Sequence, residues 1–524
     1  MENTGQRYKP KKLTNYMVSR KRRKKQITVS SNYLPAIIAI AMILGISIWS
    51  GVSNVGMGRS PFFGPSSGPT LGSNPYPNLN NNIAWPEMGG NNQRHFTQYG
   101  TVGHDSYSNY EHFGRYDDHK VKITKHDSLI YGSNMGYGIN DLVFYDVDTF
   151  QEKYSVHIND IDNFDYELEH IIITEDKTGM DQNGDGVINT MDAVLALKNN
   201  IIYGTISYWG NGNKGEIFSI KETPNGAELL NVIDSDSLNP RAIIASNKGI
   251  FILSNDGRAV NHYEVTNDLR FYDFNLNEQW SLKLEDLYDP YDIYFLINGK
   301  NMVIDSYDRL WIVPTLENYN GERLLVFNES GNVLLNEQIG TLIDRVIATD
   351  DRVYVFSITD MTTWVYDQLT LDLLWEGSIN TNPGGDIRNY GASYNKNTGN
   401  LNILKFVANG SPYEFWIQGY STRNIQPEFL WEKNIGRLYI SPTNPISDAS
   451  GKVYIFYSED DVSDPDEWKL LIMDPNGGVI FNDVVLNPIE NCLPFNTIDS
   501  LMDKKGNLYF EFSCNIMRML KLMP

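Results

Sequence analysis

Short runs of aliphatic, β-branched and aromatic residues, separated by polar turns, recur from about residue 120 to the end of the chain. Residues 351–358 form one such run. Residues 364–376 form a second, which is interrupted by a tight polar turn and returns to Trp375. A hairpin this small cannot bury its apolar face alone, so it requires copies of itself beside it. The pattern therefore predicts a series of stacked β-hairpins.

A turn followed by an aliphatic and then usually an aromatic residue marks the beginning of each unit. It recurs at Ser128–Tyr131, Gly249–Phe251, Arg309–Trp311, Arg352–Tyr354, Asn400–Asn402, Lys452–Tyr454 and Asn507–Tyr509. Hairpins follow at Leu269–Leu284, Leu324–Ile339, Trp364–Ile379, Phe415–Trp431 and Leu470–Val485, and earlier ones span Leu142–Ile158 and Glu216–Val232. Four strands in each period of about 40–55 residues are typical of a β-propeller.

These hairpins resemble the PQQ-type propeller repeat, in which an aliphatic–aromatic–Asp turn leads to a strand that ends in Trp. Val365–Asp367 with Trp375 fits this pattern well, and Phe271–Asp273 with Trp280 fits it in part. The resemblance implies an all-β fold, a β-propeller of about seven four-stranded blades over residues 106–524. It also implies that these two Trp residues and Trp431 pack between neighbouring blades. It implies no quinone cofactor, because nothing in the sequence marks a quinone site.

The last apolar run, Met517–Leu522, has no following partner in the sequence. We expect it to pair with N-terminal chain, which would close the ring of blades and remove an exposed strand edge.

An apolar segment near the N-terminus predicts a membrane anchor. Tyr33–Trp49 carries no charge and follows the basic cluster Arg20–Lys25. No charge follows until Arg59, so at 1.5 Å per residue the uncharged stretch is long enough to cross a hydrocarbon layer about 30 Å thick. We therefore assign residues 1–32 to a cytoplasmic tail and residues 33–55 to a transmembrane signal anchor, because basic residues stay on the cytoplasmic side.

The alternative for this segment is a cleavable signal peptide. The long basic region and the want of a clear Ala-x-Ala cleavage site argue against it. The expected protein is a single-pass protein of the cell membrane with an extracellular body. Residues 56–105 are rich in Gly, Pro and Asn, so we expect a flexible linker there.

One segment has the spacing of a calcium-binding loop. Its ligand positions are filled by Asp181, Asn183, Asp185, the carbonyl of Val187, Asn189 and Asp192. Ca²⁺ takes six to eight oxygen ligands, and Gly186 stands where such a loop must turn sharply. We expect Ca²⁺ here, followed by a helix from Ala193 with apolar residues on one face. The alternative is an Asn/Asp/Gly-rich turn without a metal.

The same residues resemble a dockerin type I repeat, the module that attaches polysaccharide-degrading enzymes to cohesins. The resemblance covers residues 179–203, and this chain has one such repeat where dockerins have two. A single repeat inside a propeller favours an EF-hand-like calcium loop–helix insertion that braces the fold. Cohesin is the alternative partner that the resemblance implies.

Charge and motifs limit the function. The net charge is −22, and because the first 33 residues carry +9 the remainder carries −31. An acidic body repels nucleic acid, so we expect no nucleic-acid partner. No His-Glu-x-x-His motif is present, and no phosphate-binding Gly-rich loop stands before a predicted helix.

We therefore expect a non-catalytic binding or scaffold protein that presents a propeller face to a protein or glycan. The alternative is an enzyme, or an enzyme-associated subunit, in extracellular polysaccharide degradation.

Overall fold

The computed structural model describes twenty-one stretches of the chain, and every structural statement below refers to them. They are residues 97–98, 101–116, 122–124, 127–132, 141–158, 193–198, 201–207, 215–234, 239–255, 267–287, 295–296, 301–316, 322–340, 343–357, 362–379, 387–407, 412–438, 442–458, 468–486, 500–513 and 517–524. All of them belong to one compact unit, Ser73–Pro524.

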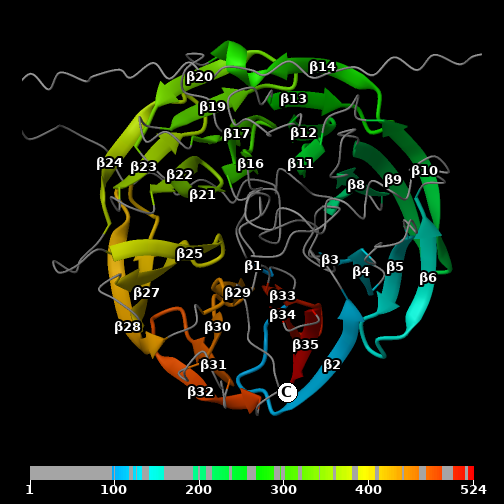
Figure 1. Ribbon diagram of the computed structural model, residues 1–524. Helices are drawn as coiled ribbons and strands as arrows, with labels where there is room; N and C mark the ends of the chain where they lie inside the picture. The colour runs from blue at the N-terminus through cyan, green and yellow to red at the C-terminus, as the bar shows by residue number, and fades with distance from the viewer. Residues whose placement is uncertain are drawn as a thin grey trace, which may run out of the picture. The chain divides into compact units, whose positions relative to one another are not determined.

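The described residues form seven antiparallel sheets of four strands, one sheet in which a fifth, parallel strand is added to four, and one two-stranded sheet; the eight larger sheets are here called blades 1 to 8 (Figure 1). Blade 1 contains β3 (Lys122–Ile123), β4 (Ser128–Gly132), β5 (Asp141–Asp146) and β6 (Glu152–His157). Blade 2 contains β7 (Ala193–Lys198), β8 (Ile201–Ser207), β9 (Gly215–Thr223) and β10 (Gly226–Asp234). Blade 3 contains β11 (Asn239–Ala245), β12 (Ile250–Asn255), β13 (Asn267–Tyr272) and β14 (Glu278–Lys283).

The middle blades follow the same order. Blade 4 contains β16 (Met302–Ile304), β17 (Leu310–Ile312), β19 (Arg323–Phe327) and β20 (Val333–Gln338). Blade 5 contains β21 (Ile343–Ala348), β22 (Arg352–Ser357), β23 (Thr362–Asp367) and β24 (Leu373–Ser378). Blade 6 contains β25 (Ile387–Asn395), β26 (Asn400–Val407), β27 (Tyr413–Ser421) and β28 (Glu428–Leu438).

The last two blades include N-terminal chain. Blade 7 contains β29 (Ile446–Asp448), β30 (Val453–Tyr457), β31 (Trp468–Met473) and β32 (Val479–Leu486), and β1 (Thr97–Gln98) adds to β29 in parallel. Blade 8 contains β33 (Ser500–Met502), β34 (Leu508–Ser513), β35 (Met517–Met523) and β2 (Asn109–Tyr116). Outside the blades, β15 (Phe295–Leu296) pairs with β18 (Thr315–Leu316), and a 3-10 helix spans Leu284–Leu287.

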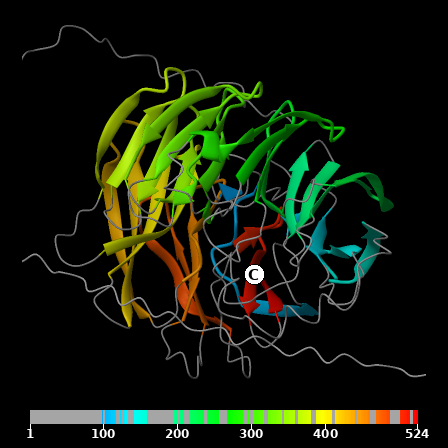
Figure 2. The same ribbon diagram turned by 45° about the horizontal axis from the view of Figure 1, so that its top comes forward.

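Buried apolar clusters join the blades in a cycle. One cluster lies between each consecutive pair from blades 1 and 2 to blades 6 and 7, and another joins blades 7, 8 and 1. The first strands of the blades lie towards the centre of this cycle and the fourth strands lie outside (Figures 1 and 2). The arrangement confirms the expected all-β fold with repeated four-stranded antiparallel sheets, and there are eight sheets instead of about seven.

The pairing of the two ends of the chain confirms the expected closure. β35 pairs with β2 from Asn109↔Met523 to Tyr116↔Met517, with a shift of register between Phe113 and Tyr116. β2 is thereby the fourth strand of blade 8, although it precedes the other three by most of the sequence. Closure leaves blade 8 as complete as the others.

The helix expected from Ala193 is wrong. Ala193–Lys198 is strand β7, which pairs with β8, and β8 also pairs with β9. The apolar residues of this segment fit a helical face and a strand equally well, so long-range pairing with β9 decides between them. Together with β9 and β10, these two strands form blade 2.

Several expectations lie outside the described residues. They are the transmembrane segment 33–55, the calcium ligands Asp181, Asn183, Asp185, Val187, Asn189 and Asp192, and most of the linker 56–105. In the part of the chain that the structure describes, no helix has the length and apolar character that a membrane crossing requires.

Trp residues of the outer strands contact the next blade, as the resemblance to the PQQ-type repeat implies. Trp280 of blade 3 donates to the carbonyl of Glu329 in blade 4, with Nε1 2.7 Å from the oxygen. Trp431 of blade 6 donates in the same way to Pro475 of blade 7, at 3.0 Å. Trp375 packs against the apolar cluster between blades 5 and 6.

In three blades the aromatic residue that marks the repeat also donates a hydrogen bond to a buried aspartate. Trp311, Tyr454 and Tyr509 each donate to the carboxylate of an Asp six residues earlier, at 2.7, 2.9 and 2.9 Å. These Asp residues, Asp305, Asp448 and Asp503, are buried and also accept backbone N–H groups of their own turns. The turn and the neighbouring strand are thus fixed by one buried carboxylate.

The Trp contact allows a test of the packing between blades. Gly477 has φ of +83°, and an added Cβ would lie 2.5 Å from the Trp431 ring. Gly477→Ala should therefore reduce the free energy of unfolding by roughly 2–4 kcal/mol, from left-handed backbone strain and overpacking together.

The matched control is Gly226→Ala, because a Cβ there meets nothing within 4 Å. It should be neutral or slightly stabilising. Chemical denaturation of the two variants measures the difference, and equal stability would contradict this account of the Trp contact.

Candidate functional site

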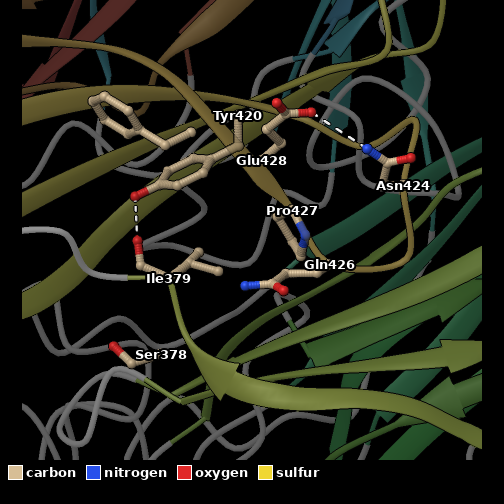
Figure 3. Close-up of a pocket in the computed structure, with 8 residues that line it drawn as sticks. Ser378, Ile379, Tyr420, Asn424, Gln426, Pro427 and Glu428 are labelled. Carbon is tan, nitrogen blue, oxygen red and sulfur yellow. Dashed lines mark hydrogen bonds between the residues drawn. The ribbon is translucent and has the colours of Figure 1, made fainter. Parts of the chain in front are cut away.

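A pocket of about 500 Å³ lies at the boundary of blades 5 and 6 (Figure 3). It is lined by the end of β24, the turn between β27 and β28, and the start of β28. The lining residues are Ser378, Ile379, Tyr420, Asn424, Gln426, Pro427, Glu428 and Phe429. The pocket therefore combines residues of two consecutive blades, from the end of the outer strand of blade 5 and from the outer hairpin of blade 6.

The turn that forms one wall is held from two sides. Arg352 of blade 5 donates to the carbonyls of Thr422 and Asn424, both at 2.8 Å. The hydroxyl of Thr422 donates to the carbonyl of Gly399, at 3.0 Å. Within the turn, the amide of Asn424 donates to a carboxylate oxygen of Glu428, at 3.3 Å (Figure 3). The wall is fixed by these contacts before any ligand arrives.

Tyr420 and Ile379 form the inner wall, and a buried lysine lies behind them. The Tyr420 hydroxyl lies within hydrogen-bond distance of the Ile379 carbonyl (Figure 3) and of Gln418 Oε1, at 2.6 Å from the latter. Lys405 Nζ lies 3.1 Å from the Tyr420 oxygen and 3.5 Å from the Ile379 carbonyl oxygen. Because the ammonium group donates to both, it ties the two wall residues together.

Burial dominates the electrostatics of this lysine. Lys405 is 2% exposed. Burial lowers its pKa to about 7, and the carboxylate of Glu432 opposes this shift only in part. Gln418 joins Glu432 to Tyr420, because its amide N–H donates to Glu432 and its side-chain carbonyl oxygen lies within hydrogen-bond distance of the Tyr420 hydroxyl. Burial also raises the pKa of Tyr420, so its hydroxyl stays protonated near neutral pH.

The position of Lys405 limits the reactions in which its amine could take part. Lys405 is not among the lining residues, because Tyr420 and Ile379 separate its amine from the pocket. The lysine therefore positions the wall and does not face a ligand. The groups that line the pocket, and that a ligand would meet, include Ser378, Gln426, Glu428 and the ring of Phe429.

Sequence reasoning missed this site. One signal for the lysine was present: Lys405 interrupts the apolar run Leu401–Val407, and an ionisable residue inside a buried strand requires a partner. The predicted calcium ligands lie outside the described residues. Among the residues that are described, no group of three or more His, Cys, Asp or Glu side chains is placed to hold a metal ion.

No protein-family model and no curated protein matches this sequence. A quinohemoprotein alcohol dehydrogenase from Pseudomonas putida HK5 is similar in structure over 84% of this chain and 80% of its own, with a TM-score of 0.51 and 10% identity. A europium-containing methanol dehydrogenase is similar over 83% and 90%, with a TM-score of 0.51 and 11% identity. BamB from Moraxella catarrhalis is similar over 79% and 97%, with a TM-score of 0.41 and 10% identity.

The likeness to the two dehydrogenases supports the PQQ-type propeller repeat fold for this chain. At these identities it shows the fold alone.

The buried lysine predicts a pH-dependent stability. Its pKa is 10.5 when unperturbed and about 7 in the fold, so between these values the unfolded chain binds more protons. The contribution of Lys405 to the free energy of unfolding therefore rises between about pH 7 and pH 10.5. The cost of burying its charged form is fully present below pH 7. The substitution Lys405→Met should remove this cost of burying a charge.

The stability gained by Lys405→Met should be larger at pH 6 than at pH 9, by roughly 2–3 kcal/mol at about 1.4 kcal/mol per pH unit. Denaturant unfolding at both pH values measures this difference. Lys283→Met controls for the loss of one exposed positive charge. A gain that is the same at both pH values would show that Lys405 does not titrate in this way.

Proposed function

We propose that this chain is a membrane-anchored extracytoplasmic β-propeller that acts as a non-catalytic binding or scaffold protein. The observation that carries the proposal is the pocket between blades 5 and 6. Its inner wall is braced by the buried Lys405, while the exposed amide of Gln426 has no hydrogen bond with any described residue. A fixed wall with unused polar groups is typical of a binding site.

The position of Lys405 favours binding over catalysis. A lysine whose pKa lies near 7 suits proton transfer or nucleophilic attack when it faces a substrate. Here the amine lies behind Tyr420 and Ile379 and donates to both. Its amine stabilises the shape of the pocket, and the reacting group of an enzyme would have to lie elsewhere.

Anchoring is proposed from the sequence. The uncharged segment Tyr33–Trp49 follows the basic cluster Arg20–Lys25, which keeps the N-terminus in the cytoplasm and the propeller outside. Proteinase added to intact spheroplasts that express the full chain should digest the propeller and spare a cytoplasmic marker. A propeller that is digested only after lysis would rule out this topology.

The non-catalytic claim has its own test. The full chain, purified in detergent, is incubated with soluble polysaccharides, and mass spectrometry measures shorter products. We expect no products above the level of heat-denatured protein. Products released by the folded chain would replace the proposal with the alternative, an enzyme or enzyme subunit of polysaccharide degradation.

We also propose one structural Ca²⁺, held by Asp181, Asn183, Asp185, the Val187 carbonyl, Asn189 and Asp192. The spacing of these oxygen ligands supports the proposal. Asp192 directly precedes β7, so the ion would brace the entry of the chain into blade 2. Because a strand follows the loop where a dockerin-like repeat led us to expect a helix, we favour bracing over attachment to a cohesin.

Calcium should stabilise the full chain. At a Ca²⁺ concentration 100-fold above the dissociation constant, binding adds about 2.7 kcal/mol to the free energy of unfolding. We expect a higher melting temperature in Ca²⁺ than in EDTA, and no difference for the double variant Asp181→Ala/Asp185→Ala. Asp372→Ala, at an exposed turn of blade 5, should keep the difference. Equal melting of the unmodified chain in both buffers would exclude the site.

A further inference from the structure

The pocket between blades 5 and 6 has one apolar and one polar side. Phe429 is 42% exposed, and with Pro427 and Ile379 it supplies apolar surface. Ser378, Asn424, Gln426 and Glu428 supply hydroxyl, amide and carboxylate groups. The volume of about 500 Å³ lies within the range of ~300–1,000 Å³ found for small-molecule sites. The ligand must therefore carry an apolar face and several hydrogen-bonding groups.

The polar groups are available in a specific arrangement. Asn424 donates one N–H to Glu428 Oε2, and no described residue contacts Asn424 Oδ1 or Glu428 Oε1. The Gln426 amide points towards the side of the pocket formed by Ser378 and Ile379 (Figure 3). Two amides and one carboxylate together offer both donors and acceptors, which suits hydroxyl groups because each hydroxyl both donates and accepts.

The aromatic ring is held in place. Phe429 contacts Tyr420 edge to face, with ring centroids 5.8 Å apart and planes at 75°. Tyr420 is fixed in turn by Ile379 and Lys405. A ring that is already oriented loses little freedom when a ligand covers it, so its contact area contributes to affinity at low cost.

Charge limits the class of ligand. Among the described residues that line the pocket, Glu428 is the one that carries a charge, and the chain after residue 33 carries a net charge of −31. An anionic ligand would meet this carboxylate, and no described lining residue offers it a cation, which is unfavourable. A neutral ligand meets no such penalty.

We propose that this pocket binds a neutral sugar unit of an oligosaccharide, which rests on the binding function proposed above. One C–H face of the sugar ring covers Phe429, and its hydroxyls bond to Gln426, Asn424 and Glu428. Ser378 and Ile379 close the opposite side. Lys405 is a positioning residue, because it acts on the ligand only through Tyr420 and Ile379.

The test is isothermal titration calorimetry on the full chain, in a detergent whose headgroup is not a sugar. The probes are cellohexaose, xylohexaose, maltohexaose, the hexamer of N-acetylglucosamine, trigalacturonate and tetra-alanine. We expect at least one of the four neutral oligosaccharides to bind, and no heat from trigalacturonate or tetra-alanine.

Variants connect binding to the pocket. Phe429→Ala and Gln426→Ala should each weaken the neutral oligosaccharide at least tenfold. Leu430→Ala is the matched control, because Leu430 is 44% exposed beside Phe429 and does not line the pocket. It should bind as the unmodified chain does, and all three variants should keep the melting temperature.

Three results would overturn the inference: no neutral probe binds, the pocket variants bind as Leu430→Ala does, or trigalacturonate or tetra-alanine binds in preference. Each leaves the anchored, non-catalytic propeller standing. Failure of that proposal appears in the other assays, as released products or as a propeller protected inside the cell.

Discussion

Closure between blade 8 and blade 1 is the constraint on which every other contact depends. Each blade has two apolar faces, and a series of such sheets leaves one face bare at either end unless the ends meet. The single cluster that joins blades 7, 8 and 1 covers those last faces. Lys521 donates to the carbonyl of Val147 at 2.7 Å, and the hydroxyl oxygen of Tyr509 lies 3.3 Å from the same carbonyl oxygen. Lys504 and Lys505 add ion pairs to Asp127 and Asp148 of blade 1.

Closure also determines what the N-terminal segment does. Residues 101–109 cross from blade 7 to blade 8, and Gly103 donates to Asp448 at 2.8 Å while Tyr107 donates to the Gly506 carbonyl at 2.5 Å. The chain then enters β2 and completes blade 8. The segment that leads to the proposed anchor is therefore attached to the two blades at the closure, and any pull on it acts on the ring where both ends of the chain meet.

Much of the fold was readable from the sequence, because its signals are local. The repeated turn and aromatic residue found seven blades, and an unpaired final run predicted closure. The β7–β8 hairpin was missed although Ile201–Tyr203 repeats the aliphatic–aromatic signature, because the run from Ala193 also fits a helical period; the pairing of β8 with β9 decides between helix and strand. The pocket was harder still: Ser378 and Phe429 meet only because blade 5 lies beside blade 6, and spacing in the sequence does not encode that distance.

Two lysines that are buried between blades, Lys521 and Lys405, make the same kind of contact with the neighbouring blade but have different effects on the structure. Lys521 lies at the junction of blades 8 and 1, with Nζ 5.0 Å from the centroid of the Phe150 ring, and the carbonyl that it meets belongs to the next blade. Lys405 does the same across blades 5 and 6, where its partners are Tyr420 and the carbonyl of Ile379. A buried ammonium must find oxygen partners because leaving it unpaired is costly, and each of these lysines has one such partner, the carbonyl of Val147 or of Ile379, on the neighbouring blade. At the closure the lysine joins blades 8 and 1, and at blades 5 and 6 the same requirement holds the wall of a pocket in place. The proposed binding site can thus be understood as a blade junction whose fixed side chains line an open pocket.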